Sequence, residues 1–162
     1  MKAILIPTDF SDNAFSQVEQ LLSNSIHEKV KLIFFHAFAM PDSEQDLLGV
    51  NAKPHSAVLN ETFRKGCVRL KEKFPAISQI AYRYMYGDSR SVLQHFINHN
   101  DISHLFLPEG ITVSLVNPRS VDITNKLIAT GLPVIQPIRE QLRVRFQPRE
   151  KQAIRLLETT AS

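Results

Sequence analysis

Residues 2–22 read KAILIPTDFSDNAFSQVEQLL, and this stretch decides the fold class. Residues 3–6 are continuously apolar, which is typical of a short strand buried on both faces of a parallel sheet. After a polar turn, four apolar residues recur at helical spacing: Phe15, Val18, Leu21 and Leu22. Either Ser11 or Asp12 can cap the start of this helix. The stretch therefore predicts a strand that passes directly into a helix.

The same alternation of apolar strands and amphipathic helices continues through residue 138. Further strands are predicted at 30–38, 77–86, 105–107 and from 133 onward, and further helices over about 59–74, after the turn at 87–89, and from about 120 to 130. Five strands and four helices in this order predict a doubly wound α/β fold, a three-layer sandwich with a mostly parallel sheet. In such folds ligands bind outside the carboxyl ends of the strands, where the strand order reverses.

The charge is distributed unevenly along the chain. The net charge is +3, yet residues 1–138 carry 13 basic and 13 acidic side chains, so the whole excess lies in residues 139–162. A neutral body argues against nucleic acid as a partner, because a nucleic-acid-binding domain needs a basic face. We therefore expect an α/β domain at 1–138 and a basic C-terminal extension at 139–162. Three alternatives remain for the extension: an edge strand plus a short helix, an arm exchanged with a partner subunit, or a basic binding tail.

Other features of the sequence predict a cytoplasmic protein with no metal site and no membrane-spanning segment. No apolar run approaches the ~20 residues of a membrane helix, and the N-terminus has no signal-peptide pattern. Cys67 is the only cysteine and lies on the apolar face of its predicted helix, which indicates a small buried hydrophobe. His95 and His99 have a chelating spacing but lie off the apolar stripe of their helix, so we predict no metal site.

Four segments resemble the universal stress protein family: the opening stretch, the strand VKLIFFHAF at 30–38, the Gly-Asp-Ser turn at 87–89, and LPVIQPI at 132–138. The resemblance implies five parallel strands in the order 3-2-1-4-5. Many members of that family dimerise by pairing their fifth strands. We therefore expect a homodimer formed through the fifth strand, the C-terminal extension, or both.

The strongest single signal of this resemblance is Pro7-Thr8-Asp9 at the end of the first strand. The family has a matching Asp there that faces an adenine nucleotide, and Pro7 and Thr8 would fix the turn that aims it. Asp9 has an alternative role as a cap of the first helix, together with Ser11. His36, near the end of the second strand, either lines the same pocket or is a core histidine with its hydrogen bonds satisfied.

The family's glycine-rich phosphate signature is incomplete in this sequence. Only Gly110 is present, Arg119 stands where the glycine before Ser120 would be, and Glu109 brings negative charge toward a phosphate. The chain thus resembles the branch thought not to bind ATP. Alternatively, Arg119 and Ser120 bind a phosphate at the start of the fourth helix. In the simpler interpretation, Ser120 only caps that helix and Arg119 pairs with Glu109.

These observations favour a non-enzymatic module resembling universal stress proteins. We expect a dimeric stress-response or regulatory binding protein with a small-molecule ligand at the carboxyl edge of the sheet and with ATP binding weakened or lost. No catalytic residue and no required cofactor are predicted; ATP or another adenine nucleotide is the candidate ligand. The alternative is an adenine-nucleotide-binding protein, or an enzyme acting on an adenine-containing compound, for which Asp9, His36, Glu109 and Arg119 are the available groups.

Overall fold

The computed structural model describes residues 1–24, 28–40 and 58–135. Its elements in chain order are β1 (Lys2–Pro7), α1 (Asn13–Asn24), β2 (Val30–Phe38), α4 (Glu61–Lys73), β3 (Ile77–Tyr86), α5 (Arg90–His99), β4 (His104–Phe106), the 3₁₀ helix η1 (Val113–Leu115), β5 (Ser120–Val121), α6 (Thr124–Ile128) and β6 (Val134–Ile135). The extension predicted at 139–162 lies outside the described residues, so its structure stays a prediction.

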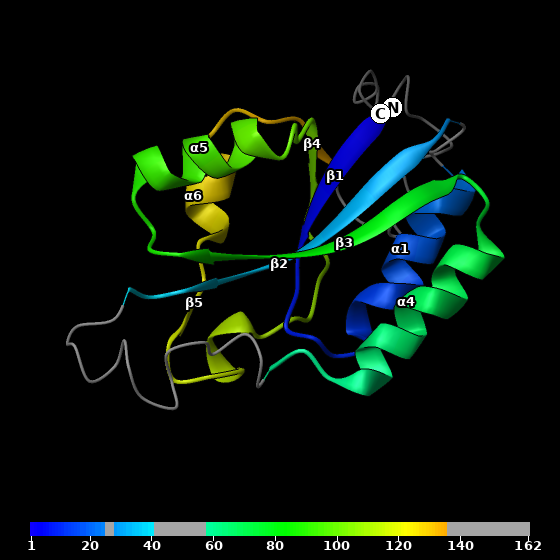
Figure 1. The fold of residues 1–162 in the computed structure, drawn as a ribbon, viewed down its shortest axis with the longest axis horizontal. Helices are drawn as coiled ribbons and strands as arrows, with labels where there is room; N and C mark the ends of the chain where they lie inside the picture. The colour runs from blue at the N-terminus through cyan, green and yellow to red at the C-terminus, as the bar shows by residue number, and fades with distance from the viewer. Residues whose placement is uncertain (25–27, 41–57, 136–162) are drawn as a thin grey trace, which may run out of the picture.

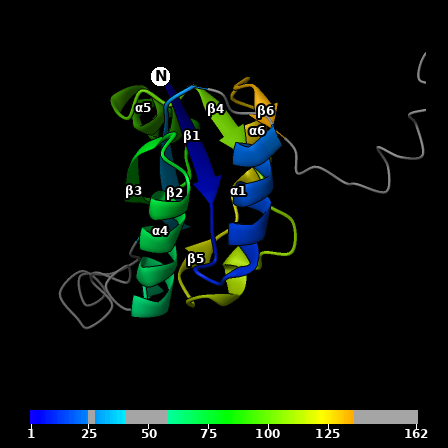
Figure 2. The ribbon, with the colours of Figure 1, turned by 90° about the vertical axis from the view of Figure 1, so that its right-hand side faces the viewer.

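The strands form one sheet in the order β3-β2-β1-β4-β6, and each neighbouring pair in this order is parallel. Helices α1 and α4 cover one face of the sheet, and α5 and α6 cover the other (Figures 1 and 2). The predicted doubly wound α/β sandwich is therefore confirmed, with β6 as the fifth strand of the predicted order. Within the described part of the chain, no helix is long and apolar enough to span a bilayer.

Strand β2, second in the sheet order, is apolar at seven of its nine positions because both of its faces are buried. Leu32 and Phe34 pack in the core beneath α1 and α4, whereas Ile33 and Phe35 pack in the core beneath α5 and α6. Successive side chains of a strand point to opposite faces, so a strand covered by helices on both sides favours apolar residues at consecutive positions. This is the physical reason why the sequence VKLIFFHAF lacks the alternation of a half-exposed strand.

A glycine allows the two helices on the first face to approach closely. A Cβ atom at Gly66 of α4 would lie 2.4 Å from the ring of Phe15 in α1. That ring stacks on Phe63 with centroids 5.0 Å apart, and Phe63 is fully buried. The absence of a side chain at Gly66 thus makes room for the aromatic contact that joins α1 to α4.

The predicted helix from residue 120 to 130 is wrong at its start. Ser120 and Val121 form β5, which pairs antiparallel with Phe38 and Ala37 of β2, and α6 begins only at Thr124. Strand β1 ends at Pro7, opposite Phe35, so the last residues of β2 have no partner on that side until β5 supplies one. The backbone hydrogen bonds that Ser120 and Val121 form with the end of β2 outweigh the helical pattern of their sequence.

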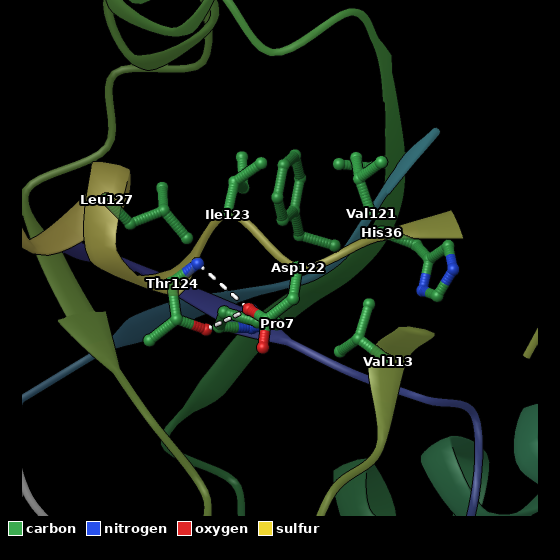
Figure 3. A pocket seen from close by; sticks show the side chains of 10 residues that line it. Pro7, His36, Val113, Val121, Asp122, Ile123, Thr124 and Leu127 are labelled. Carbon is green, nitrogen blue, oxygen red and sulfur yellow. Dashed lines mark hydrogen bonds between the residues drawn. The ribbon is translucent and has the colours of Figure 1, made fainter. Parts of the chain in front are cut away.

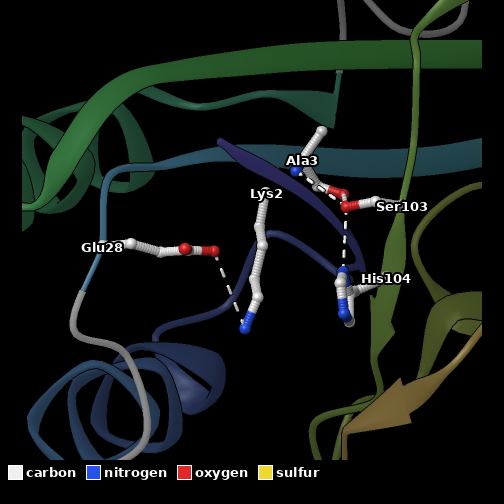
Figure 4. A network of polar contacts seen from close by, with 5 residues as sticks. All are labelled: Lys2, Ala3, Glu28, Ser103 and His104. Carbon is white, nitrogen blue, oxygen red and sulfur yellow. Dashed lines mark hydrogen bonds and ion pairs between the residues drawn. The ribbon is translucent and has the colours of Figure 1, made fainter.

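A polar network closes the opposite, amino-terminal edge of the sheet between β1 and β4 (Figure 4). The Ser103 hydroxyl accepts a hydrogen bond from the amide of Ala3 at 3.0 Å and lies 2.8 Å from Nδ1 of His104. Lys2 forms an exposed ion pair with Glu28 nearby, at 3.8 Å. These side chains bond to one another and to the backbone at the amino-terminal edge, opposite the edge where ligands bind in this fold class.

Candidate functional site

A hydrogen-bonded chain of three residues joins β1, β2 and β5 at the carboxyl edge. His36 is only 1% exposed; its Nδ1 lies 2.8 Å from the carbonyl oxygen of Thr8, and its Nε2 lies 2.7 Å from the hydroxyl of Ser120. The rings of Phe10 and Phe38 enclose the imidazole, with centroids 5.1 and 4.8 Å away. These hydrogen bonds thus fasten β5 to β2 and to the residue that follows β1.

The partners of His36 determine its tautomer. The carbonyl of Thr8 can only accept, so Nδ1 carries the proton and donates, and Nε2 accepts from the hydroxyl of Ser120. Burial lowers the pKa of His36, against the opposing effects of the Thr8 carbonyl and the negative charge of Asp9. The imidazole is therefore neutral, and both of its nitrogens are used by the protein itself.

At the carboxyl edge, beyond the end of β1, side chains fill most of the crevice on the face that α5 and α6 cover. The space that remains there is about 10 Å³, which holds at most one water molecule. Figure 3 shows the side chains around it, which come from the ends of β1 and β2, from η1 and from the segment around β5; its labelled members are Pro7, His36, Val113, Val121, Asp122, Ile123, Thr124 and Leu127. The ring of His36 points away from this space, toward the other face of the sheet. No small-molecule ligand fits here.

The Asp9 carboxylate is held by donors from its own chain. Its Oδ1 accepts from the amide of Ser11 at 3.0 Å and from the hydroxyl of Ser11 at 2.6 Å, and its Oδ2 accepts from the amide of Thr112 at 2.9 Å. Burial raises the pKa of Asp9, but these hydrogen bonds outweigh that effect and the net pKa is lowered. Asp9 is thus an anion at neutral pH that fastens the turn after β1 to the loop after β4.

Phe10 adopts a left-handed backbone conformation with a φ of 62°. This conformation is rare for a bulky residue and costs about 1–3 kcal/mol, so the surroundings must hold it. The amide of Phe10 donates to the hydroxyl of Thr8, and its ring packs edge-on against Phe63 in the core. The strained turn directs the Phe10 ring inward and leaves Asp9, one residue earlier, beside the loop.

An open groove of about 460 Å³ lies next to this turn, on the face covered by α1 and α4. The residues that line it come from the turn after β1, from the start of α4, and from η1 with its flanking residues: Asp9, Phe10, Val58, Asn60, Thr112, Leu115 and Val116. The side chain of Asn60 caps α4, since its Oδ1 accepts from the amide of Phe63 at 2.8 Å. The groove has the volume of a small-molecule site and is open to solvent.

The other predicted site residues do not converge on Asp9. Gly110 has a φ of 81°, and its carbonyl accepts from the side chain of Asn13. The guanidinium of Arg119 donates to the carbonyl of Ala39 at 2.9 Å. The amide of Ala39 donates to the carbonyl of Arg119 at 2.7 Å, so Arg119 extends the pairing of β5 with β2.

The prediction that Ser120 caps the fourth helix is wrong. Ser120 is 8% exposed, belongs to β5, and directs its hydroxyl at His36. The phosphate site predicted for Arg119 and Ser120 at a helix start therefore loses its structural basis. Helix α6 spans only Thr124–Ile128, and its first turn follows an Asp122 carboxylate that accepts from Thr124.

Sequence reasoning missed most of the residues that line the groove. Only Asp9 is in both sets; Thr112 and Leu115 lie in the loop after β4, where the expected signal was glycine. Asn60 could have been identified from the sequence, because an Asn directly before an apolar helix pattern is a typical N-cap. Nothing in the sequence pattern predicts that η1 folds against the turn after β1.

Comparison with known proteins supports the fold. No family model matches the sequence, and no curated protein matches it. Among solved structures, the chain is similar to universal stress protein UspA from Lactobacillus plantarum, with a TM-score of 0.53, 17% identity, and coverage of 85% of this chain and 97% of that one.

Two hypothetical proteins with solved structures are similar to a comparable degree. PH0823 has a TM-score of 0.51 and 19% identity, with 84% of this chain and 94% of that one covered. MJ0577 has a TM-score of 0.51 and 15% identity, with coverages of 85% and 96%. At these identities the similarity establishes a fold like that of universal stress proteins.

Proposed function

We propose that this chain is a non-enzymatic, universal-stress-protein-like binding module of the cytoplasm. In this proposal it acts as a dimer in a stress-response or regulatory role and binds a small ligand in the groove at the carboxyl edge of its sheet, and its affinity for ATP is weakened or lost. The similarity of its fold to UspA supports the class of protein. The geometry around Asp9 supports the part of the proposal that concerns the ligand.

The hydrogen bonding of Asp9 carries the proposal. The carboxylate that would face an adenine nucleotide instead accepts from Ser11 and Thr112 of its own chain. A ribose or adenine brings only neutral donors, which would have to compete with the neutral donors that are already in place. Arg119 likewise bonds to the carbonyl of Ala39, which draws its charge away from a phosphate. Both observations favour weak or absent ATP binding.

The proposed dimer rests on the position of β6. This strand is the last in the sheet order within the described residues, next to β4. A strand at the end of a sheet has backbone groups available for pairing with another chain. We expect size-exclusion chromatography with light scattering to give the mass of a dimer for the full chain; a monomer at micromolar concentration would contradict this part of the proposal.

Isothermal titration with ATP, ADP and AMP tests the ligand site. We expect no binding of micromolar affinity by any of the three. Micromolar binding that is lost in Asp9→Ala and kept in Asp12→Ala would contradict the proposal and support a nucleotide-binding protein. Asp12 is the matched control because it is an exposed carboxylate of the same turn that does not line the groove.

Chromatography of products after incubation with ATP separates the binding module from an enzyme. We expect no turnover above the rate of a buffer control. Robust turnover that is lost in Asp9→Ala would establish the alternative, an enzyme acting on an adenine-containing compound.

A further inference from the structure

The groove beside Asp9 has an uncompensated negative charge. Among the described residues that line it, Asp9 is the only one with an ionisable side chain, and no ion pair within residues 1–24, 28–40 and 58–135 involves this carboxylate. The donors of Ser11 and Thr112 are neutral, so they stabilise the charge without cancelling it. A phosphate or carboxylate brought into the groove would be repelled, whereas a cation would be attracted.

Four apolar residues line the groove beside the polar Asp9, Asn60 and Thr112. Phe10, Val58, Leu115 and Val116 line it, and Leu115 is 80% exposed although it is a large hydrophobic residue. An apolar ligand that covered Leu115 would remove this surface from water, which is favourable by about 25 cal/mol for each Å² buried. The site therefore combines one anion with an exposed apolar side chain, Leu115.

The polar side chains at the rim contribute little further recognition. The amide of Thr112 is already bonded to Asp9, and the Oδ1 of Asn60 caps α4. The Nδ2 of Asn60 lies 3.4 Å from the carbonyl of Phe10, at the long end of the range for a hydrogen bond. A ligand rich in hydroxyls or phosphates would find few partners here.

We propose that the groove binds a small organic amine, with its ammonium group against the Asp9 carboxylate and its apolar body against Leu115 and Val116. The inference rests on the proposed binding site and names the class of ligand that this site takes. The open space of about 460 Å³ is ample for a molecule with one ring or a short branched chain. Charge complementarity and the exposed leucine select this ligand over a nucleotide.

Three probes of the same size and different charge test the proposal: benzylamine, benzyl alcohol and benzoate. Each is titrated into the ¹⁵N-labelled full chain, and binding is followed through backbone amide shifts of Thr112, which bonds to Asp9. We expect saturable shifts with benzylamine, an affinity about fivefold weaker for benzyl alcohol, and no binding of benzoate. Equal affinities for the three probes, a preference for benzoate, or no shift with any of them at millimolar concentration would overturn the proposal.

Variants of Asp9 and Leu115 test which side chain causes the preference for benzylamine over benzyl alcohol. Asp9→Asn is expected to bind benzylamine and benzyl alcohol equally, whereas Asp12→Asn keeps the preference of the original chain. Leu115→Ser is expected to weaken both probes and to leave the spectrum otherwise folded, because the side chain is exposed. A preference that persists in Asp9→Asn would contradict the role of this carboxylate.

The outcome separates this inference from the proposed function. Failure of the amine to bind, with no nucleotide binding either, rejects the ligand class and leaves the proposed binding module standing. Micromolar ATP binding that depends on Asp9 rejects the proposed loss of ATP binding, whatever the three probes show.

Discussion

The two faces of the sheet end differently at the same carboxyl edge. On the face of α5 and α6 the crevice holds about 10 Å³ of free space, whereas on the face of α1 and α4 an open groove of about 460 Å³ lies beside Asp9. Strand β5 causes the closure, because it pairs with the end of β2 and is fastened there by His36. Ligands in this fold class bind outside the carboxyl ends of the strands. In the part of this protein that the structure describes, only the face of α1 and α4 leaves open space at that position.

Consecutive residues serve the two regions. The carbonyl of Thr8 accepts from His36, the side chain that fastens the strand β5 that closes the crevice, while the carboxylate of Asp9 faces the loop of the open groove. Phe10 contributes to both, since its ring contacts His36 and also lines the groove. The comparison predicts that substitutions in the closed region lower stability, and that those in the open groove change binding at little cost in stability.

The largest effect is expected from His36→Ala. The substitution removes the ring contacts with Phe10 and Phe38 and leaves the hydroxyl of Ser120 and the carbonyl of Thr8 without their partner. We expect the free energy of unfolding to fall by about 3 kcal/mol in urea denaturation. The exposed His95→Ala is the control, with a change within about 0.5 kcal/mol. Equal effects of the two variants would refute the role of His36 in closing the crevice.

A smaller loss is expected from Ser120→Ala. Without the hydroxyl, the acceptor nitrogen of His36 is buried and unpaired, which costs about 1–3 kcal/mol. Ser120→Thr retains a hydroxyl and should lose less. In a double-mutant cycle with His36→Phe, the two losses should sum to more than the loss of the double variant. Strict additivity would show that the two side chains do not interact.

Stability should also depend on pH through His36. Burial lowers its pKa in the folded chain below the ordinary value of 6.5, so below that pH the unfolded chain binds a proton that the folded chain does not. Stability is then full above about pH 6.5 and falls as the pH drops below it. We expect calorimetry between pH 7 and pH 5 to show a smaller loss of Tm in His36→Phe than in the original chain.

His104 has a pKa lowered in the same direction, by burial and by the charge of Lys2. His104 is present both in the original chain and in His36→Phe, so the difference between their pH dependences of Tm reports on His36 alone. An identical pH dependence in the two proteins would contradict the buried neutral imidazole.

The smallest change in stability is expected from Leu115→Ser in the open groove. Leu115 is 80% exposed, and its replacement should alter the free energy of unfolding by less than about 0.5 kcal/mol. A loss comparable to that of Ser120→Ala would show that η1 is part of the core and would remove the distinction between the two regions.

The strands could be predicted from the sequence because burial leaves apolar patterns in it, nearly continuous at 30–38 and alternating at 77–86. Residues 30–38 and 77–86 are strands in the structure with the predicted bounds. The side chains of Tyr82, Tyr84 and Tyr86 pack beneath the helices of one face, as their alternation indicates. The start of the fourth helix could not be predicted, because its first residues are recruited by the unpaired end of β2, a partner more than 80 residues away.

The site was predicted only in part, for a similar reason. Asp9 follows an obvious strand, so its position at the carboxyl edge can be derived from sequence. Its partner Thr112 is 103 residues distant and stands in a loop without regular spacing. The role of His36 likewise depends on Ser120, which a local pattern assigns to a helix. Long-range hydrogen bonds of this kind leave no periodic signal in a single sequence.

A map of amide shifts on titration with benzylamine tests most directly whether ligands enter the open groove and not the closed crevice. The account predicts that the largest shifts fall on Thr112, Leu115 and Val116, and that Val121 and Thr124 beside the crevice remain unchanged. Shifts centred on Val121 and Thr124, with Thr112 unaffected, would contradict it.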